Sequence, residues 1–160
     1  MSSYTFFAMK NVYKVKQMNS GSSKIKKFRH NVGQNWYHVV LVTKFRGKVF
    51  QWDITNVIAR EELSNACEKH SIELYTLEVM SDHAHLFVAC PPDMPIRRML
   101  RLIKGASSYH IRRRYPSLKK YKHLWNRGAM YRSVGSVSAE VVERYIKRND
   151  WGSIHQKKLI

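Results

Sequence analysis

Two apolar segments separated by only three residues constrain the fold of this chain more than any other feature. Residues 72–79 and 83–90 are mostly aliphatic or aromatic, as strands are, and residues 80–82 connect them. So short a connection joins antiparallel neighbours, because parallel strands need a crossover of about a dozen residues. The diproline at 91–92 ends the second segment. The chain therefore contains a β-hairpin, against which its other elements must pack.

The residues on either side of this hairpin predict two helices and one more strand. Residues 36–43 are aromatic and β-branched, which favours a strand. Asp53 is a suitable N-cap for a helix that runs to about Lys69. Pro95 can open a second helix, with one apolar and one basic face, that ends at Pro116.

Two further elements complete the predicted order. Residues 130–134 indicate a fourth strand, and Ser136 or Ser138 can cap a last helix through about Asn149. The order β-α-β-β-α-β-α predicts an α+β domain of the ferredoxin-like, split βαβ type. We expect an antiparallel sheet with helices on one face, and an additional C-terminal helix.

Composition divides the chain into one domain and two tails. Residues 1–33 are basic and contain too little apolar surface to pack, so we expect a flexible N-terminal tail. Residues 34–152 are expected to form a single domain, followed by a C-terminal tail over 153–160. The two cysteines, Cys67 and Cys90, lie in apolar patterns and are expected to be reduced core thiols. With no visible signal peptide or membrane-spanning run, this favours a cytoplasmic protein without membrane contact.

The charge distribution indicates which partner such a domain binds. The chain has 29 Lys and Arg residues against 11 Asp and Glu, a net charge of +18. Ten of these cations precede Asp53 and twelve lie between Asp93 and Glu140, and neither stretch contains an acid. Such stretches repel themselves unless a polyanion lies between them, which makes nucleic acid the first candidate partner.

Two histidines are the first candidate for chemistry. Alternate side chains of a strand share a face, so His83 and His85 point the same way and are close enough to bind one ion. On a solvated face the same pair can instead be an edge residue and its hydrogen-bonded neighbour. Taken alone, a His-x-His motif more often has this second role.

Tyr145 and Asn149 are the second candidate. They are four residues apart on the predicted last helix and therefore share a face, with Arg144, Lys147 and Arg148 around them. A phenol flanked by cations can form a phenolate and attack phosphorus, and an amide oxygen suits a divalent ion. A tyrosine on such a helix is more often a core or rim aromatic, so the spacing alone leaves both roles open.

Four sequence blocks, in order and with matching spacing, carry a resemblance to a known family. They are LEVMSDHAHLFV at 77–88, LIKGASS at 102–108, LWNRGAMY at 124–131, and SVG at 133–135 followed by Tyr145-Ile146. From about Trp36 to Gly152 the chain resembles the TnpA-type transposases of insertion sequences. These are the single-tyrosine members of the His-hydrophobic-His nucleotidyltransferases.

The resemblance implies a catalytic domain that cleaves and rejoins single-stranded DNA at hairpin-containing element ends. It implies that His83 and His85 bind Mg²⁺ or Mn²⁺ and that Tyr145 forms a covalent 5′-phosphotyrosine. Family members usually have glutamine as third ligand where this chain has Asn149, which is shorter by one methylene. Asn149 can bind the ion directly or through water, or leave the site weaker. The resemblance also implies a homodimer with active sites shared between subunits.

DNA backbone contacts are assigned to the basic face of the second helix and to the segment after it. The alternative role for these cations is a solvated helix face. Two other functions remain open: a domesticated endonuclease of the same family that cuts repeat hairpins, and a non-enzymatic ferredoxin-like module that binds single-stranded nucleic acid. The residues assigned to DNA are Lys104, Arg112, Arg113, Lys119 and Lys120.

Overall fold

A computed structural model describes residues 26–27, 32–33 and 35–134 of the 160-residue chain. The predicted C-terminal helix with Tyr145 and Asn149, and most of the predicted N-terminal tail, lie outside the described residues. Two short strands, β1 (Lys26–Lys27) and β2 (Val32–Gly33), pair with each other and fall within the segment predicted as a tail.

The main sheet contains four strands in the order β4-β5-β3-β6, and each neighbouring pair is antiparallel. The strands are β3 (Trp36–Val42), β4 (Glu73–Val79), β5 (His83–Ala89) and β6 (Met130–Val134). The chain reaches them in the order β3-α1-β4-β5-α2-β6, which confirms the first six predicted elements. The hairpin between β4 and β5 closes where the Met80 amide donates to the His83 carbonyl at 2.8 Å.

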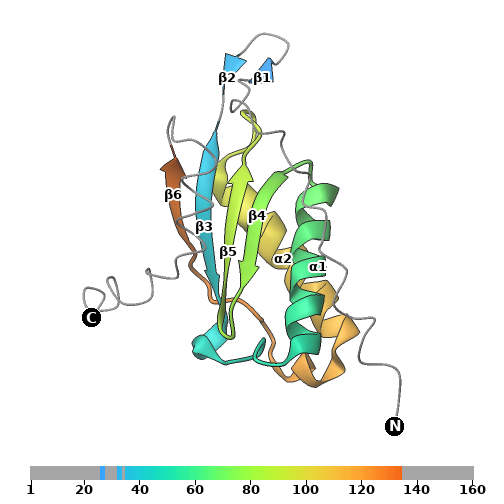
Figure 1. Ribbon diagram of the computed structural model, residues 1–160. Helices are drawn as coiled ribbons and strands as arrows, with labels where there is room; N and C mark the ends of the chain where they lie inside the picture. The colour runs from blue at the N-terminus through green and yellow to red at the C-terminus, as the bar shows by residue number, and fades with distance from the viewer. Residues whose placement is uncertain (1–25, 28–31, 34, 135–160) are drawn as a thin grey trace, which may run out of the picture.

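Helices α1 (Asp53–Lys69) and α2 (Ile96–Arg114) cover one face of this sheet (Figure 1). The predicted N-cap of α1 was one residue off, because Trp52 occupies that position and Asp53 begins the helix without a side-chain cap. The two helices are also joined by charge, since Arg114 on α2 pairs with Glu61 and Glu62 on α1.

The core lies between the helices and the sheet. Alternate residues of the two central strands point into it and are fully buried, as strand periodicity requires. Cys67 and Cys90 are free and buried, as predicted, and burial raises the pKa of the Cys67 thiol to about 12. The buried strand residues that pack on the helices are Val39, Leu41, Ala84, Leu86 and Val88.

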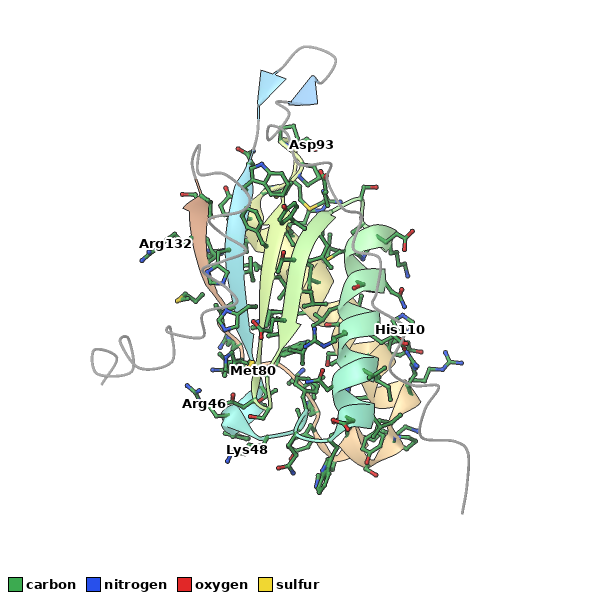
Figure 2. The ribbon with its side chains drawn as sticks, viewed as in Figure 1. Arg46, Lys48, Met80, Asp93, His110 and Arg132 are labelled. Carbon is green, nitrogen blue, oxygen red and sulfur yellow. The ribbon has the colours of Figure 1, made fainter. Side chains whose placement is uncertain are left out.

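Two short 3₁₀ segments complete the described fold: η1 (Lys44–Arg46) after β3 and η2 (Pro116–Lys120) after α2. Arg46 in η1 lies at the same end of the sheet as Met80 in the hairpin turn (Figure 2). Neither helix in the described part of the chain combines the length and the apolar composition needed to cross a bilayer.

Candidate functional site

The two predicted histidines lie on the face of the sheet that the helices leave uncovered. His83 and His85 alternate along β5 with Ala84, Leu86 and Val88, which point into the helix-covered core. The rings of the two histidines are 4.9 Å apart between centroids and nearly perpendicular. The structure therefore brings together the pair that the strand pattern predicted.

A third histidine, which the sequence analysis did not identify, joins this pair. His38 lies on the neighbouring strand β3 and is 5% exposed. Its Nε2 is 3.1 Å from Nδ1 of His85, and the two rings stack at 5.3 Å with 10° between their planes. The contact depends on β3 and β5 being neighbours in register, which places Val40 opposite His85 and His38 opposite Phe87. His38 could not be predicted as a neighbour of His85 without knowing this strand pairing, because the two histidines are 47 residues apart in the sequence.

Burial keeps two of these imidazoles neutral. Desolvation, followed by the neighbouring His38 and His83, lowers the pKa of His85 to about 4. Desolvation and the charge of Arg132 also lower the pKa of His38. Neutral imidazole is the form that binds metal ions, so His85 is ready to do so at neutral pH without first losing a proton.

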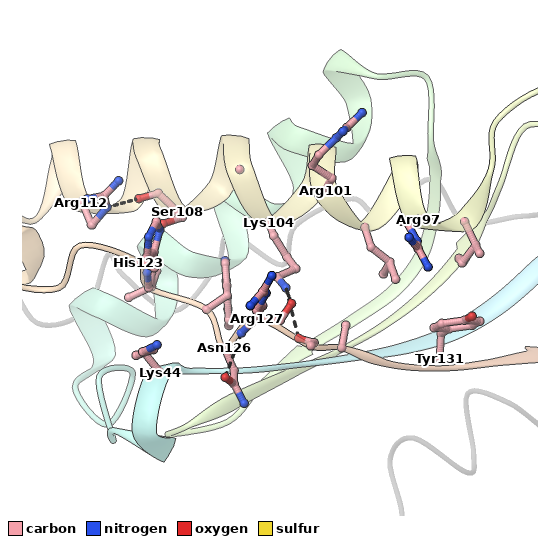
Figure 3. A pocket seen from close by; sticks show the side chains of 17 residues that line it. Lys44, Arg97, Arg101, Lys104, Ser108, Arg112, His123, Asn126, Arg127 and Tyr131 are labelled. Carbon is pink, nitrogen blue, oxygen red and sulfur yellow. Dashed lines mark hydrogen bonds between the residues drawn. The ribbon is translucent and has the colours of Figure 1, made fainter.

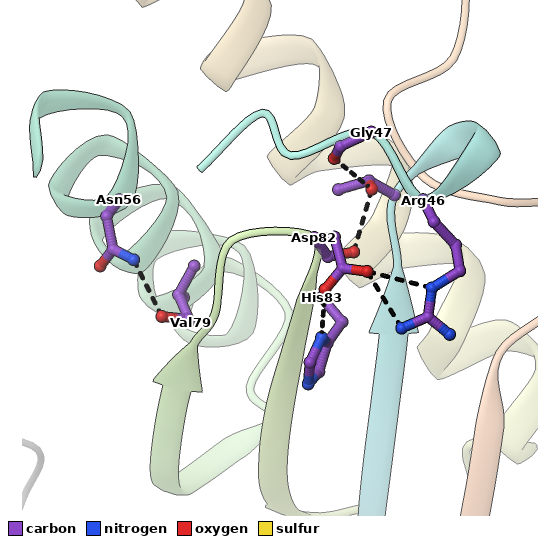
Figure 4. A network of polar contacts seen from close by, with 7 residues as sticks. Arg46, Gly47, Asn56, Val79, Asp82 and His83 are labelled. Atoms are coloured by element: carbon purple, nitrogen blue, oxygen red, sulfur yellow. Dashed lines mark hydrogen bonds and ion pairs between the residues drawn. The ribbon is translucent and has the colours of Figure 1, made fainter. Parts of the chain in front are cut away.

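His83 is held by a carboxylate in the hairpin turn. Oδ1 of Asp82 lies 2.6 Å from Nδ1 of His83, while Oδ2 accepts from Nε of Arg46 at 3.0 Å (Figure 4). Partial burial opposes ionisation of Asp82, but the His83 hydrogen bond and the charge of Arg46 outweigh it and lower the pKa of this carboxyl. An ionised Asp82 accepts a hydrogen bond from Nδ1–H of His83 and leaves Nε2 of that ring for a ligand.

Another polar group on this face is Glu78 of β4, which lies directly opposite His85. Its Oε2 is buried, and within the described residues it has no hydrogen-bond partner. A buried carboxylate oxygen is costly without a partner, so this position suits a cation or a proton donor. The sequence pattern indicated only a strand here.

The donor set fits a divalent ion in part. Two neutral imidazoles, one oriented by a carboxylate, are suitable ligands, and an orphaned carboxylate oxygen lies on the adjacent strand. Within the described ranges, however, no three His, Cys, Asp or Glu side chains form a group that could hold an ion. A complete site therefore requires at least one more ligand besides His83 and His85. The predicted third ligand, Asn149, and the predicted nucleophile, Tyr145, lie outside those ranges.

A second feature is a basic groove of about 1130 Å³ between α2 and the segment that leads into β6 (Figure 3). Among the residues that the structure describes, six Lys and Arg side chains line it and no acid does. Such a surface attracts a phosphate backbone by charge alone. The cationic lining residues are Lys44, Arg97, Arg101, Lys104, Arg112 and Arg127, with His123 beside them.

Two of the five residues predicted to contact DNA line this groove. The Lys104 ammonium donates to the carbonyls of Arg127 at 2.7 Å and Gly128 at 3.1 Å, which fixes the wall opposite α2. Desolvation there lowers the pKa of Lys104. Arg112 donates to the Ser108 carbonyl at 3.0 Å, as Figure 3 shows. Both side chains therefore also shape the groove.

The other three predicted contacts lie outside the groove. Arg113, Lys119 and Lys120 are exposed near the end of α2 and in η2. Lys120 lines a smaller hollow and lies 5.4 Å from the ring centre of Tyr121. Arg97 and Arg101 also line the groove; they belong to the basic face of α2 that was assigned to DNA but were not named individually, and Arg127 was not assigned.

Comparisons with known proteins agree with this combination of features. The sequence pattern of the family described as "Transposase IS200 like" matches residues 31–149. The ISDra2 transposase TnpA of Deinococcus radiodurans is 29% identical over 126 residues, which cover 77% of this chain and 89% of that protein. The transposase for insertion sequence element IS200 of Salmonella typhimurium is 29% identical over 114 residues, which cover 69% of this chain and 74% of the relative.

Solved structures agree in fold. A crystal structure from Deinococcus radiodurans, described as a transposase, superposes with a TM-score of 0.63 at 28% identity, covering 77% of this chain and 96% of that one. A REP-associated tyrosine transposase bound to a REP hairpin superposes with a TM-score of 0.51 at 13% identity, covering 80% of this chain and 75% of that one. The family pattern spans well over half of the sequence, and this chain therefore belongs to the IS200-like transposase family.

Proposed function

We propose that this protein cleaves and rejoins single-stranded DNA at hairpin-containing element ends, through a covalent link between Tyr145 and a 5′ phosphate. The observation that carries the proposal is the pair His83 and His85, placed on one open sheet face in a chain of a transposase family. The basic groove supports DNA as the substrate, because the described residues that line it include six cations and no acid.

In this proposal His83, His85 and Asn149 hold a Mg²⁺ or Mn²⁺ ion. Such an ion supplies Lewis-acid polarisation of a non-bridging phosphate oxygen. The residues of the chain perform the remaining tasks. Asp82 orients His83 through its Nδ1 proton, and His38 supports the ring of His85.

The proposed covalent step is a transesterification. The phenolate oxygen of Tyr145 attacks phosphorus, the bond from phosphorus to the 3′ oxygen breaks, and that oxygen leaves as a 3′ hydroxyl after taking up a proton. The ester energy stays in the phosphotyrosine, so no nucleotide is consumed. Attack by another 3′ hydroxyl reverses the step, joins new ends and restores the tyrosine.

We further propose that the protein acts as a homodimer whose active sites are shared between subunits. Tyr145 would then reach the histidines of the partner subunit rather than those of its own chain. Mixing a Tyr145→Phe chain with a His83→Ala chain distinguishes these arrangements. Cleavage should be restored in mixed dimers if the site is shared, and should stay absent if each subunit acts alone.

The central test is incubation of the full chain with Mn²⁺ and single-stranded DNA that carries a hairpin, followed by a denaturing gel. We expect a protein–DNA adduct that disappears with chelator and in Tyr145→Phe. Tyr109→Phe is the matched control, because this exposed tyrosine lies on α2 away from the histidines. Fully duplex DNA should give little adduct. An adduct that persists in Tyr145→Phe would assign the nucleophile to another residue.

A further inference from the structure

The turn η1 holds an aromatic residue, Phe45, in an unusual backbone conformation, next in sequence to the Arg46 that pairs with Asp82. Phe45 has φ 58° and ψ 22°, and the next residue, Arg46, has φ 52°. The left-handed region costs roughly 1–2 kcal/mol for a residue with a Cβ, and bulky side chains occur there rarely. The Phe45 ring is also 86% exposed, so it contributes little to the core. Folding alone gives no reason for phenylalanine at this position.

The turn is fixed at both ends. The Thr43 hydroxyl lies 2.7 Å from the Gly47 carbonyl and 2.9 Å from the Asp82 carbonyl, and the amide of Thr43 also donates to Asp82. The amide of Lys44 donates to the Leu124 carbonyl at 2.8 Å. The exposed ring is therefore presented from an anchored backbone, which lowers the entropic cost of binding.

The turn also connects the two features described above. Lys44 lines the basic groove, whereas Arg46 forms an ion pair with Asp82, the carboxylate that holds His83. Phe45 lies between these two residues in sequence. A nucleic-acid strand that runs from Lys44 in the groove to His83 would pass this turn.

We propose that Phe45 is a stacking platform for an unpaired base next to the scissile phosphate. An aromatic face stacks on any base, and a nearby cation neutralises the adjoining phosphate. The Lys44 ammonium lies 4.9 Å from the centre of the Phe45 ring and supplies that cation. This inference rests on the proposed function, since it assigns a base-binding position to the same site.

Nucleic acid suits this position better than a protein partner does. Phe45 is flanked by Lys44 and Arg46, and the groove, which Lys44 also lines, has no acid among its lining residues in the described part of the chain. A second copy of a chain with net charge +18 would bring further cations to this surface. Exposed aromatic side chains beside a cationic groove are the arrangement that single-strand binding proteins use.

The test measures binding separately from cleavage. A hairpin oligonucleotide with a single-stranded flank carries 2-aminopurine at successive flank positions, and the protein is the full chain with Tyr145→Phe. Anisotropy gives the affinity, and quenching of 2-aminopurine reports stacking. Phe45→Ala and Phe45→Asn remove the ring, and asparagine also tolerates the left-handed backbone. Phe45→Trp keeps an aromatic face, and Tyr109→Ala is the control at another exposed aromatic.

We expect Phe45→Ala and Phe45→Asn to bind the single-stranded substrate about tenfold more weakly, in line with one lost base stack. Quenching should disappear at one flank position, and binding of duplex DNA should stay unchanged. Phe45→Trp should bind within about threefold of the parent, since tryptophan also stacks. Phe45→Asn should unfold at the same or a higher temperature, so a loss of binding in this variant is not a folding defect.

Three results would overturn the inference. The first is an affinity loss in Phe45→Asn no larger than in Tyr109→Ala. The second is an equal loss on duplex DNA, which would indicate a general electrostatic effect. The third is dissociation of a dimer in Phe45→Asn during sedimentation, which would assign the ring to a contact between copies. If the parent itself binds no single-stranded DNA, the proposed function fails and this inference fails with it.

Discussion

The contact between His38 and His85 leads to a specific prediction about metal affinity. His38→Phe keeps a ring of similar size in a site that is 5% exposed, but removes the nitrogen that lies 3.1 Å from Nδ1 of His85. Leaving a buried polar atom without its partner costs about 1–3 kcal/mol. Loss of a group that supports a metal ligand weakens binding by about 10–100-fold, or roughly 1.4–2.7 kcal/mol. The cost of the unpaired nitrogen and the free-energy equivalent of the weaker metal binding fall in the same range, so we expect the Mn²⁺ dissociation constant to rise by about 10–100-fold.

The assay is titration of the full chain with Mn²⁺, with free ion detected by electron paramagnetic resonance. His38→Gln places an amide near Nδ1 of His85, and we expect it to retain most of the affinity. His110→Phe on α2 is the control, because this ring contacts Tyr109 rather than the site. Circular dichroism and thermal unfolding establish that each variant is folded. A nitrogen-detected spectrum of the imidazoles should show a changed tautomer for His85 in His38→Phe only.

The reasoning would be refuted if His38→Phe, folded as the parent is, bound Mn²⁺ with unchanged affinity. It would also be refuted if His38→Gln lost affinity while His38→Phe kept it. In that case the stacking of the two rings, rather than the hydrogen bond, would hold His85 in place. The spectrum of the imidazoles separates these outcomes, because stacking alone leaves the tautomer free.

Four further predictions follow from other contacts. Asp82→Ala should weaken Mn²⁺ binding by about 10–100-fold, because it removes the acceptor of the His83 proton, whereas Asp93→Ala, at an exposed site, should not change it. Asn149→Gln should retain or increase metal-dependent cleavage on the denaturing gel, and its complete loss would show that the site depends on the shorter side chain. Trp125→Phe should lower the free energy of unfolding, measured in urea, by about 1–3 kcal/mol, because the Nε1 of Trp125 lies 2.9 Å from the buried Ser107 hydroxyl. Trp52→Phe, at a residue that is 62% exposed, should change this free energy by less than about 0.5 kcal/mol. In metal-free protein, burial lowers the pKa of His85 from 6.5 to about 4. Between these two pH values the unfolded chain binds more protons than the folded chain does, so the urea concentration at the midpoint of unfolding should fall as the pH drops from 6.5 to 4. His85→Phe should reduce this dependence of stability on pH.

Local patterns in the sequence were sufficient to predict the order of the six elements β3, α1, β4, β5, α2 and β6. The hairpin at 80–82 set the antiparallel pairing, and alternation along 83–90 correctly placed His83 and His85 on one face. Strand pairing between distant segments was not encoded in any local pattern. His38 belongs to the histidine cluster only because β3 pairs with β5, and Glu78 lies opposite His85 only because of the hairpin register. Long-range register of this kind depends on packing of the whole core.

The turn η1 and the basic groove also depend on contacts between distant segments, which local sequence patterns did not predict. Phe45 and Arg46 gave no sequence signal, since the left-handed backbone there is imposed by hydrogen bonds from Thr43 and to Leu124. The basic face of α2 was visible from its spacing, but the opposite wall was not. That wall depends on Lys104 reaching the carbonyls of Arg127 and Gly128, across 23 and 24 residues.

The pairing of β3 with β5 limits how this histidine cluster can change. A shift of the β3–β5 register by one residue would turn His38 into the hydrophobic core and put Tyr37 or Val39 beside His85, because neighbouring side chains of a strand point to opposite faces. A single inserted or deleted codon within β3 would thus dismantle the cluster while leaving its composition intact. Lineages that remodel this region are expected to exchange side chains one at a time, or to shift the strand by two positions at once.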